Sequence, residues 1–230
     1  MDMSRAYMNW SGGKDSSLCL HRALQSGNLP VDFLLTSVNA FHNRISMHGV
    51  RRELLQAQAD SIGIPLLTVE LPEQPGMAEY ERLMTEKVQF LKSRGCTRAI
   101  FGDIFLEDLK RYREEQLNNL GMRCEFPLWQ LSTRQLVTDF IREGFKAIIV
   151  CVNDRYLDKR FCGRLIDESF LGDLPENVDP CGENGEYHSF VFEGPIFTNP
   201  IPFTNGDVVH RHYKAPGDNT QYGFYFMDLL

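Results

Sequence analysis

The sequence predicts an α/β protein in which a parallel sheet is followed by a smaller α+β unit. Short apolar strand patterns alternate with amphipathic helix patterns through the first half of the chain. Such short connections are typical of parallel strands joined by helices that cover the sheet. The pattern changes near Phe126-Pro127, and turn residues become frequent beyond one further helix and strand. We therefore expect two parts, residues 1–126 and residues 127–230.

Each element of the first half has its own signal. Two helices are expected to end at Gly27 and Gly63, because glycine adopts the left-handed conformation that closes helices. The apolar run 31–38 is typical of a strand buried on both faces. A third helix has apolar residues at spacings of 3, 4, 4 and 3 from Met77 to Leu91. The expected strands are 5–10, 31–38, 66–71 and 98–101, and the expected helices are 15–26, 51–62, 77–91 and 106–120.

The second half predicts fewer helices and several antiparallel strands. A helix over 133–143 and a strand over 146–152 come first. Further strands are expected at 187–192, 207–213 and 222–227. The last two flank a turn at Pro216-Gly217-Asp218-Asn219, so they should form a hairpin.

Length, charge and cysteine content exclude several classes of protein. The 230 residues can bury a substantial core, and the formal net charge of −7 argues against a nucleic-acid binder. The six cysteines form no C-x-x-C pair, which argues against a zinc knuckle or a disulfide framework and favours a reduced, cytoplasmic protein. No apolar run reaches 18 residues and no signal-peptide pattern opens the chain, so we expect no membrane association.

The strongest motif is Ser11-Gly12-Gly13-Lys14-Asp15-Ser16, which follows a strand and opens a helix. Glycines there let backbone N–H groups approach an anion, and the helix N-terminus and Lys14 add positive charge. The spacing is neither G-x-x-x-x-G-K-[ST] nor G-x-G-x-x-G. The alternative is an ordinary glycine-rich turn. In its strand–turn–helix context, the hexapeptide predicts a phosphate or pyrophosphate site.

This hexapeptide resembles the pyrophosphate-binding loop of the PP-loop (N-type) ATP pyrophosphatases. The resemblance implies a Rossmann-like adenine-nucleotide alpha-hydrolase (HUP) fold. It also implies an enzyme that cleaves ATP to AMP and pyrophosphate while it adenylates a substrate oxygen, and a nucleophile that then displaces AMP.

Further motifs resemble the diphthine–ammonia ligase (diphthamide synthetase) family. They are S-M-H-G-V-R-R-E-L at 46–54, Q-A-D at 58–60, G-I-P-L at 63–66, G-D-I at 102–104 and C-G-E-N-G-E-Y-H at 181–188. The resemblance runs from about residue 6 to about residue 202. Asn184 stands where the eukaryotic and archaeal ligases commonly have glycine, and the pattern looks most like that of bacterial relatives. Since bacteria do not make diphthamide, the resemblance supports the chemistry better than the named acceptor.

Several residues are candidates for binding ATP. The candidates are Ser11, Gly12, Gly13, Lys14, Asp15, Ser16, Ser17, Val38, Asn39, His48, Gly102 and Asp103. Each side chain has a structural alternative: Asp15 could only complement the helix dipole, Asp103 could only cap the next helix, and His48 could only be solvated. Val38-Asn39 is either an ordinary strand end or, as in related folds, a source of backbone groups for adenine.

The expected catalytic residues are Lys14, Asp15, Glu183 and Glu186. Glu183 and Glu186 lie three apart in a glycine-containing turn, where carboxylates could hold Mg²⁺, orient an amine or act as a base. The sequence does not divide these roles between them and assigns no metal ligand. Cys181 is interpreted as structural, because no partner base accompanies it.

The resemblance thus implies an ATP- and Mg²⁺-dependent amidoligase that adenylates an acceptor carboxylate, releases pyrophosphate and forms an amide with ammonia. The acceptor would be a modified protein residue such as diphthine, or a small carboxylate. One alternative is a sulfur-transferring PP-loop enzyme acting on tRNA, which the missing C-x-x-C pairs and the acidic charge disfavour. Another is an ATP or AMP sensor without turnover.

Overall fold

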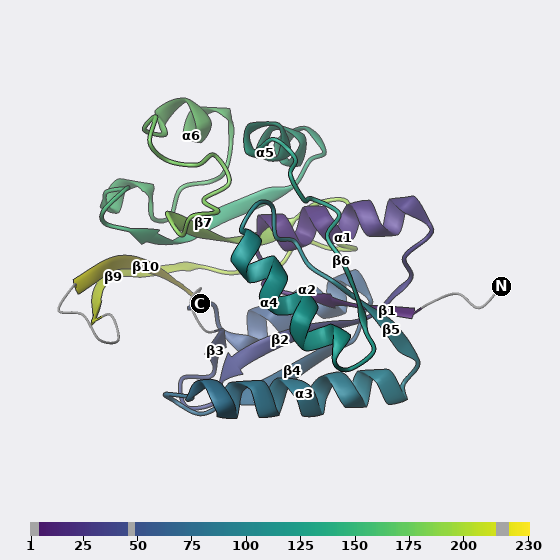
Figure 1. The fold of residues 1–230 in the computed structure, drawn as a ribbon. Coiled ribbons are helices and arrows are strands. Elements are labelled where there is room, and N and C mark those ends of the chain that lie inside the picture. Colours follow the sequence, from purple (N-terminus) through teal and green to yellow (C-terminus); the bar gives the residue numbers. More distant parts are fainter. Residues whose placement is uncertain (1–4, 46–48, 215–220) are drawn as a thin grey trace.

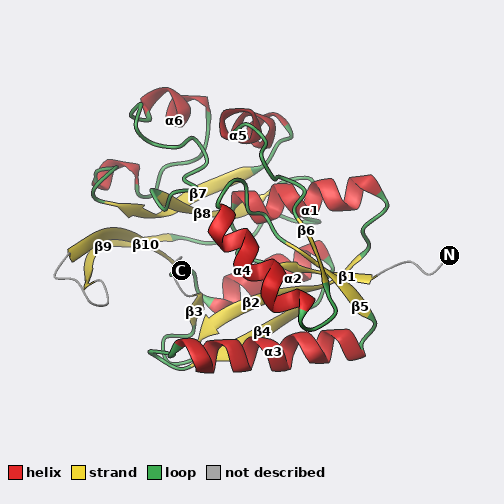
Figure 2. Cartoon of the chain, in the orientation of Figure 1, coloured by secondary structure: helices red, strands yellow, loops and turns green. Residues whose placement is uncertain are grey.

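The computed structural model describes residues 5–45, 49–214 and 221–230. Its first half alternates strands and helices as expected (Figures 1 and 2). The strands are β1 Arg5–Asn9, β2 Val31–Asn39, β3 Arg44–Ile45, β4 Leu66–Leu71, β5 Cys96–Ile100 and β6 Arg123–Glu125. The helices are α1 Lys14–Ser26, α2 Arg52–Ile62, α3 Met77–Ser93 and α4 Glu107–Asn118.

The first sheet is parallel except for the short strand β3. Its parallel strands run in the order β4-β2-β1-β5-β6. The antiparallel strand β3 pairs with the end of β2, at Val38 and Asn39, and makes an isolated bridge from Arg44 to Arg51. The chain therefore moves outward from β1 through β2 to β4 and then returns to β5 on the other side. Ligands of open α/β sheets bind at such a reversal, here at the carboxyl ends of β1 and β5, and we refer to this edge of the sheet as the crevice.

Alternate residues of β1 enter two different apolar cores. Ala6 and Met8 pack with α1, α2 and residues of the second half. Tyr7 lies on the opposite face and packs with Val88 of α3 and Leu117 of α4. The parallel sheet is thus buried on both faces, which is why its strands are rich in apolar residues.

The second half forms an antiparallel sheet with two helices and a 3₁₀ turn. The helices are α5 Thr133–Arg142 and α6 Glu168–Asp173, and the 3₁₀ turn is η1 Lys159–Phe161. The strands are β7 Lys146–Asn153, β8 Tyr187–Glu193, β9 Asn205–Lys214 and β10 Gln221–Leu229, in the order β8-β7-β10-β9. Within the described ranges, none of the helices combines the length and the apolar character needed to span a membrane.

One continuous core joins the two halves. Leu20 of α1 and Leu55 of α2 belong to the same buried cluster as Phe140 of α5 and Phe190 of β8. Charge supports the junction at the end of β10, where Asp228 accepts hydrogen bonds from Arg44 (2.8 Å) and Arg51 (2.8 Å). These two guanidinium groups, Arg51 first, hold the pKa of Asp228 well below its usual value.

The predicted α/β fold class is confirmed, and most element boundaries agree within two residues. The strands β3 and β6 and the helix α6 were not expected. The two-residue β3 and the polar Arg-Cys-Glu of β6 are too short to show a period, so tertiary pairing alone makes them strands. The turn at Pro216–Asn219 lies outside the described residues, although the hairpin strands β9 and β10 do pair.

Asp228→Asn should lower the free energy of unfolding by about 1–2 kcal/mol at pH 7, because two charge-assisted hydrogen bonds are weakened. Asp207→Asn, at an exposed carboxylate on the same hairpin, is the matched control. Because the pKa of Asp228 is lower in the folded state than in the unfolded state, its ionised carboxylate stabilises the fold fully above about pH 4. This stabilisation is lost progressively as the pH falls toward the folded-state pKa. Urea titrations from pH 7 to pH 3 should therefore show the difference between wild type and variant shrinking. An equal loss in Asp207→Asn would contradict this account.

Candidate functional site

The glycine-rich loop lies at the carboxyl end of β1, inside the crevice where the sheet reverses direction. Gly12 has a φ of 74°, and Gly13 is extended and occupies the N-cap position of α1. A Cβ on Gly12 would stand 2.6 Å from Leu55 Cδ2, so a side chain there is excluded by space as well as by conformation. The 13-residue helix α1 therefore begins at a glycine, which has no side chain to accept hydrogen bonds from the first amides of the helix.

Hydroxyl groups fix the shape of this loop. Ser11 Oγ accepts from Gly13 N at 3.3 Å and donates to Ser16 Oγ at 3.0 Å. Ser16 Oγ donates in turn to the carbonyl of Gly13 at 2.9 Å. The hydroxyl of Ser17, a residue that is 0 % exposed, has no hydrogen-bond partner among the described residues.

Strand β8 of the second sheet is attached directly to the loop. The amide of Val191 donates to the carbonyl of Gly12 at 2.9 Å, and Ser189 Oγ accepts from Lys14 N at 3.1 Å. A Cβ on Gly13 would lie 3.0 Å from the carbonyl oxygen of Ser189. Glycine at position 13 is thus required by the approach of β8 as well as by any approach of an anion.

Gln58 of α2 braces this junction from inside the core. Its side chain is 0 % exposed. The amide nitrogen donates to the carbonyls of Gly12 (3.0 Å) and Val191 (2.6 Å), and the amide oxygen accepts from Trp10 Nε1 (3.0 Å). One buried amide of α2 therefore satisfies three groups from two other segments, the loop after β1 and β8, so the loop, α2 and β8 are positioned as a unit.

Lys14 joins the loop to the turn at 179–186. Its side chain is 4 % exposed, and its ammonium donates to Asp15 Oδ2 (2.6 Å) and to the carbonyl of Cys181. The ammonium also lies 5.3 Å from the centroid of the Tyr187 ring. Burial opposes the charge, but Asp15 and Tyr187 outweigh it and raise the pKa of Lys14 well above its usual value. Lys14 therefore remains a cation at the centre of the site.

The turn at 179–186 is held by two carboxylates. Asp179 Oδ2 accepts from the amides of Cys181 (2.9 Å) and Glu183 (3.1 Å). Glu186, which is 1 % exposed, accepts from the amide of Asp179 (3.0 Å) and from both the amide and the side chain of Asn184 (2.9 and 3.1 Å). The Glu186 carboxylate thus accepts these hydrogen bonds from residues of its own turn.

Glu183 points instead toward the end of β5. Its Oε1 accepts from the amide of Ile104 at 2.8 Å. Partial burial, together with the negative charges of Asp15 and Asp103, raises the pKa of Glu183 to about 7, although the Ile104 amide opposes the shift. Glu183 can therefore gain or lose a proton near neutral pH.

Residues after β5 complete the crevice. A Cβ on Gly102 would lie 3.1 Å from the carbonyl carbon of Asp15, so the β5 turn contacts the start of α1 through a glycine. Asp103 is paired with Arg113 of α4 at 3.1 Å. Burial raises the pKa of Asp15, with Lys14 opposing the change. Turns from β1, β5 and the second half thus meet around Lys14.

Other predicted residues stand apart from this group or belong to its structural support. Val38 is buried at the end of β2, and the Asn39 side chain accepts from the amides of Phe41 and His42 and donates to the carbonyl of Glu73. Asn39 thus organises its own loop. His48 lies outside the described residues. The buried Cys181 thiol donates to a backbone carbonyl at 3.2 Å, in agreement with a structural role.

The sequence interpretation missed Gln58, Ser189 and Asp179. Gln58 lies on the same helix face as Leu55, Ala59 and Ile62, so the helical period could have indicated its burial. Ser189 alternates with Tyr187 and Val191 along β8, which places the three on one face of the strand.

The carboxylates of the crevice are suited to Mg²⁺, which prefers oxygen ligands. Asp15, Asp103 and Glu183 come from three turns, and the negative charges of Asp15 and Asp103 contribute to the raised pKa of Glu183. In this structure Asp15 is paired with Lys14 and Asp103 with Arg113, and among the described residues these carboxylates do not form a preassembled metal site.

A mostly parallel sheet of this strand order, with a glycine-rich loop at its point of reversal, is the arrangement of a nucleotide-binding α/β protein of the PP-loop class. The model of the family described as Diphthamide synthase N-terminal domain matches residues 3–124. The model of the Diphthamide synthase C-terminal domain matches residues 132–214. The chain belongs to the diphthamide synthase family, and the identification made from its motifs is confirmed.

Named relatives agree with this assignment. The chain is 25 % identical to the diphthine–ammonia ligase of Schizosaccharomyces pombe, with 87 % of this chain and 36 % of the relative covered. It is 24 % identical to the bovine and human diphthine–ammonia ligases, covering 89 % and 86 % of this chain and 85 % and 82 % of those relatives. The chain thus spans about a third of the yeast relative and more than four fifths of the mammalian ones.

Gly12→Ala should destabilise the protein by more than Gly27→Ala, its matched control. Both glycines have positive φ, but a Cβ at Gly27 meets nothing within 4 Å, whereas one at Gly12 meets Leu55 and Gln58. We expect a loss of about 1 kcal/mol for Gly27→Ala and about 2–4 kcal/mol for Gly12→Ala, measured by urea unfolding. Equal losses would show that the space around Gly12 is not restrictive.

Proposed function

We propose that this protein uses ATP to adenylate an acceptor carboxylate and then forms an amide with ammonia. The observation that carries the proposal is the buried Lys14 ammonium, which joins the anion-binding loop to the Cys181 carbonyl of the opposing turn. The relatives are named diphthine–ammonia ligases, which indicates ammonia as nucleophile and a diphthine-bearing protein as acceptor. We propose the same acceptor class here.

The proposed reaction has two steps, adenylation of the acceptor and formation of the amide. An acceptor carboxylate oxygen attacks the α-phosphorus of ATP, the bond to the β-phosphate oxygen breaks, and pyrophosphate leaves. Ammonia then attacks the acyl carbon, AMP leaves with the bonding electron pair, and the nitrogen loses a proton as the amide forms. Each step develops negative charge on phosphate oxygens, so preorganised positive charge is the main requirement.

The loop and its surroundings supply that charge. Amides at the start of α1 would bind the phosphates, and Lys14 would stabilise the charge on the transferred phosphorus and on the leaving group. The residues that could contribute ligands to Mg²⁺ are Asp15 and Asp103, and the bound ion would neutralise phosphate charge. The candidates Ser11, Ser16 and Ser17 stand on the same loop, and Ser17 has the hydroxyl left unpaired.

Glu183 and Glu186 are proposed to have different roles. Glu183 has a pKa of about 7 and can accept the proton that the attacking ammonia loses. Glu186 accepts three hydrogen bonds within its turn and would position that turn.

Residues 1–126 would bind ATP, and residues 127–230 would bind the acceptor. The free cysteines favour a cytoplasmic location.

Lys14→Met should reduce AMP formation by about 10²–10³-fold, because the ammonium is lost while the volume of the side chain is nearly kept. Lys159→Met, at an exposed lysine, should leave the rate unchanged. The assay measures AMP and pyrophosphate with ATP, Mg²⁺, ammonia and either a diphthine-bearing protein or small carboxylates. ATP binding without AMP from any acceptor would identify a sensor instead, and a fully active Lys14→Met would contradict the site.

The rate of amide formation should fall as the pH drops through about 7, since Glu183 accepts a proton only when ionised. Glu183→Gln should be slower and should lose this inflection. The concentration of unprotonated ammonia is held constant across the pH series, so that the profile reports the enzyme. An inflection near pH 7 that persists in Glu183→Gln would assign the proton transfer to another group.

A further inference from the structure

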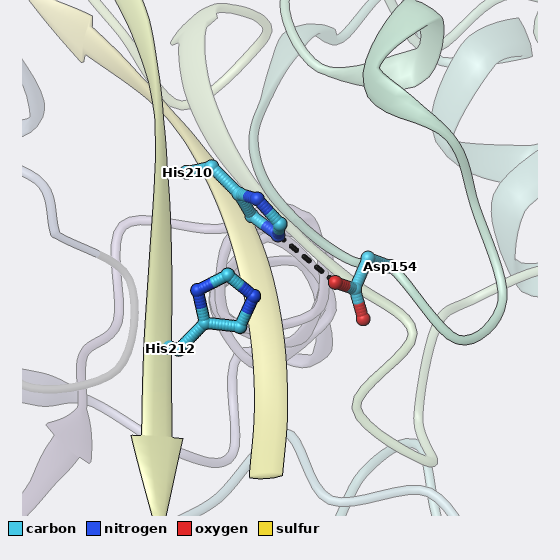
Figure 3. A group of neighbouring side chains, drawn as sticks. All are labelled: Asp154, His210 and His212. Carbon is cyan, nitrogen blue, oxygen red and sulfur yellow. Dashed lines mark hydrogen bonds and ion pairs between the residues drawn. The ribbon is translucent and has the colours of Figure 1, made fainter.

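A second cluster of chemically active side chains lies on the antiparallel sheet, apart from the crevice. Asp154 follows β7, and His210 and His212 stand two residues apart on β9 (Figure 3). One potential ligand atom from each side chain lies within 4.8 Å of the other two. His210 Nε2 is 2.9 Å from Asp154 Oδ2, and the two imidazole centroids are 4.2 Å apart.

Strand register explains why these residues meet. His212 pairs with Gly223 and His210 pairs with Tyr225, so both histidines project from the same face of β9. The amide of Asp154 donates to the carbonyl of Gly223 at 3.0 Å, which places the backbone of Asp154 on the far side of β10 from β9. The Tyr225 ring stacks on His210 with centroids 4.2 Å apart and so fixes its orientation.

A missing side chain at Gly223 opens the space between them. A Cβ there would overlap Asp154 Oδ2 and would lie 2.9 Å from His210 Nε2. The glycine therefore allows the carboxylate to cross β10 and reach the imidazoles. Any other residue at this position would fill the volume in which the three donor sets converge.

We propose that Asp154, His210 and His212 bind a divalent transition-metal ion of the zinc type. Two imidazoles and a carboxylate suit Zn²⁺ and other borderline ions, and three protein ligands leave coordination positions open to solvent. Ligand atoms about 2.0–2.1 Å from one ion stand at most about 4.2 Å apart, so the exposed side chains need only a small closure to bind it. The ion would link the end of β7 to β9 across β10.

The test titrates Zn²⁺ into the full chain, prepared without a histidine tag and stripped of metal by a chelator. We expect one ion per chain, bound in the micromolar range or more tightly, and a raised melting temperature when it is bound. His212→Ala and Gly223→Ala should each weaken binding by about 10–100-fold and abolish the thermal shift. Arg211→Ala, on the opposite face of the same strand, is the matched control and should behave as wild type.

Cobalt distinguishes this site from the cysteines. Co²⁺ in place of Zn²⁺ should give visible bands of nitrogen and oxygen coordination that disappear in His212→Ala. A cobalt–thiolate charge-transfer band would assign the ion to cysteine and overturn the proposal. Substoichiometric binding by wild type, or wild-type affinity in a His210→Ala/His212→Ala double variant, would overturn it as well. None of these measurements involves ATP, so their outcome is independent of the ligase reaction.

Discussion

The attachment of β8 to the backbone of Gly12 and Lys14 is the contact on which the rest of the site depends. The loop ends a strand of one sheet, and β8 belongs to the other, so these hydrogen bonds set the position of one half of the chain against the other. Gln58 makes the contact rigid by satisfying Gly12 and Val191 from within the core. Since β8 continues directly from the turn at 179–186, fixing β8 also fixes Glu183 relative to the loop.

The electrostatics of the crevice follow from this arrangement. The chain carries a formal net charge of −7, so positive potential for a polyphosphate must be local. The positive potential comes from the start of α1 and from Lys14. The buried Lys14 ammonium stays charged because it pairs with Asp15 and donates a hydrogen bond to the Cys181 carbonyl. The surrounding carboxylates repel one another, and this repulsion together with burial brings Glu183 into the neutral pH range.

Sequence periodicity and turn chemistry were sufficient to predict the parallel sheet, its helices and the loop, because those signals are local. The same local signals could not reveal which distant elements meet. The contact between Gly12 and Val191 spans 179 positions, and the burial of Gln58 depends on β8 lying against α2. The expected contact of the Val38-Asn39 backbone with adenine stays a prediction, because the hydrogen bonds that shape the following loop involve only the Asn39 side chain.

Glu183 and Glu186 show how identical side chains three positions apart acquire different properties. Glu186 is buried, and three donors of its own turn surround its carboxylate, so it stabilises that turn. Glu183 receives one amide, from Ile104 on another element, and faces the negative charges of Asp15 and Asp103. The ordered turn is therefore what brings Glu183 to the end of β5. The proton affinity of Glu183 is thus set by its neighbours at the sheet edge, and any movement of β8 against the loop would change it.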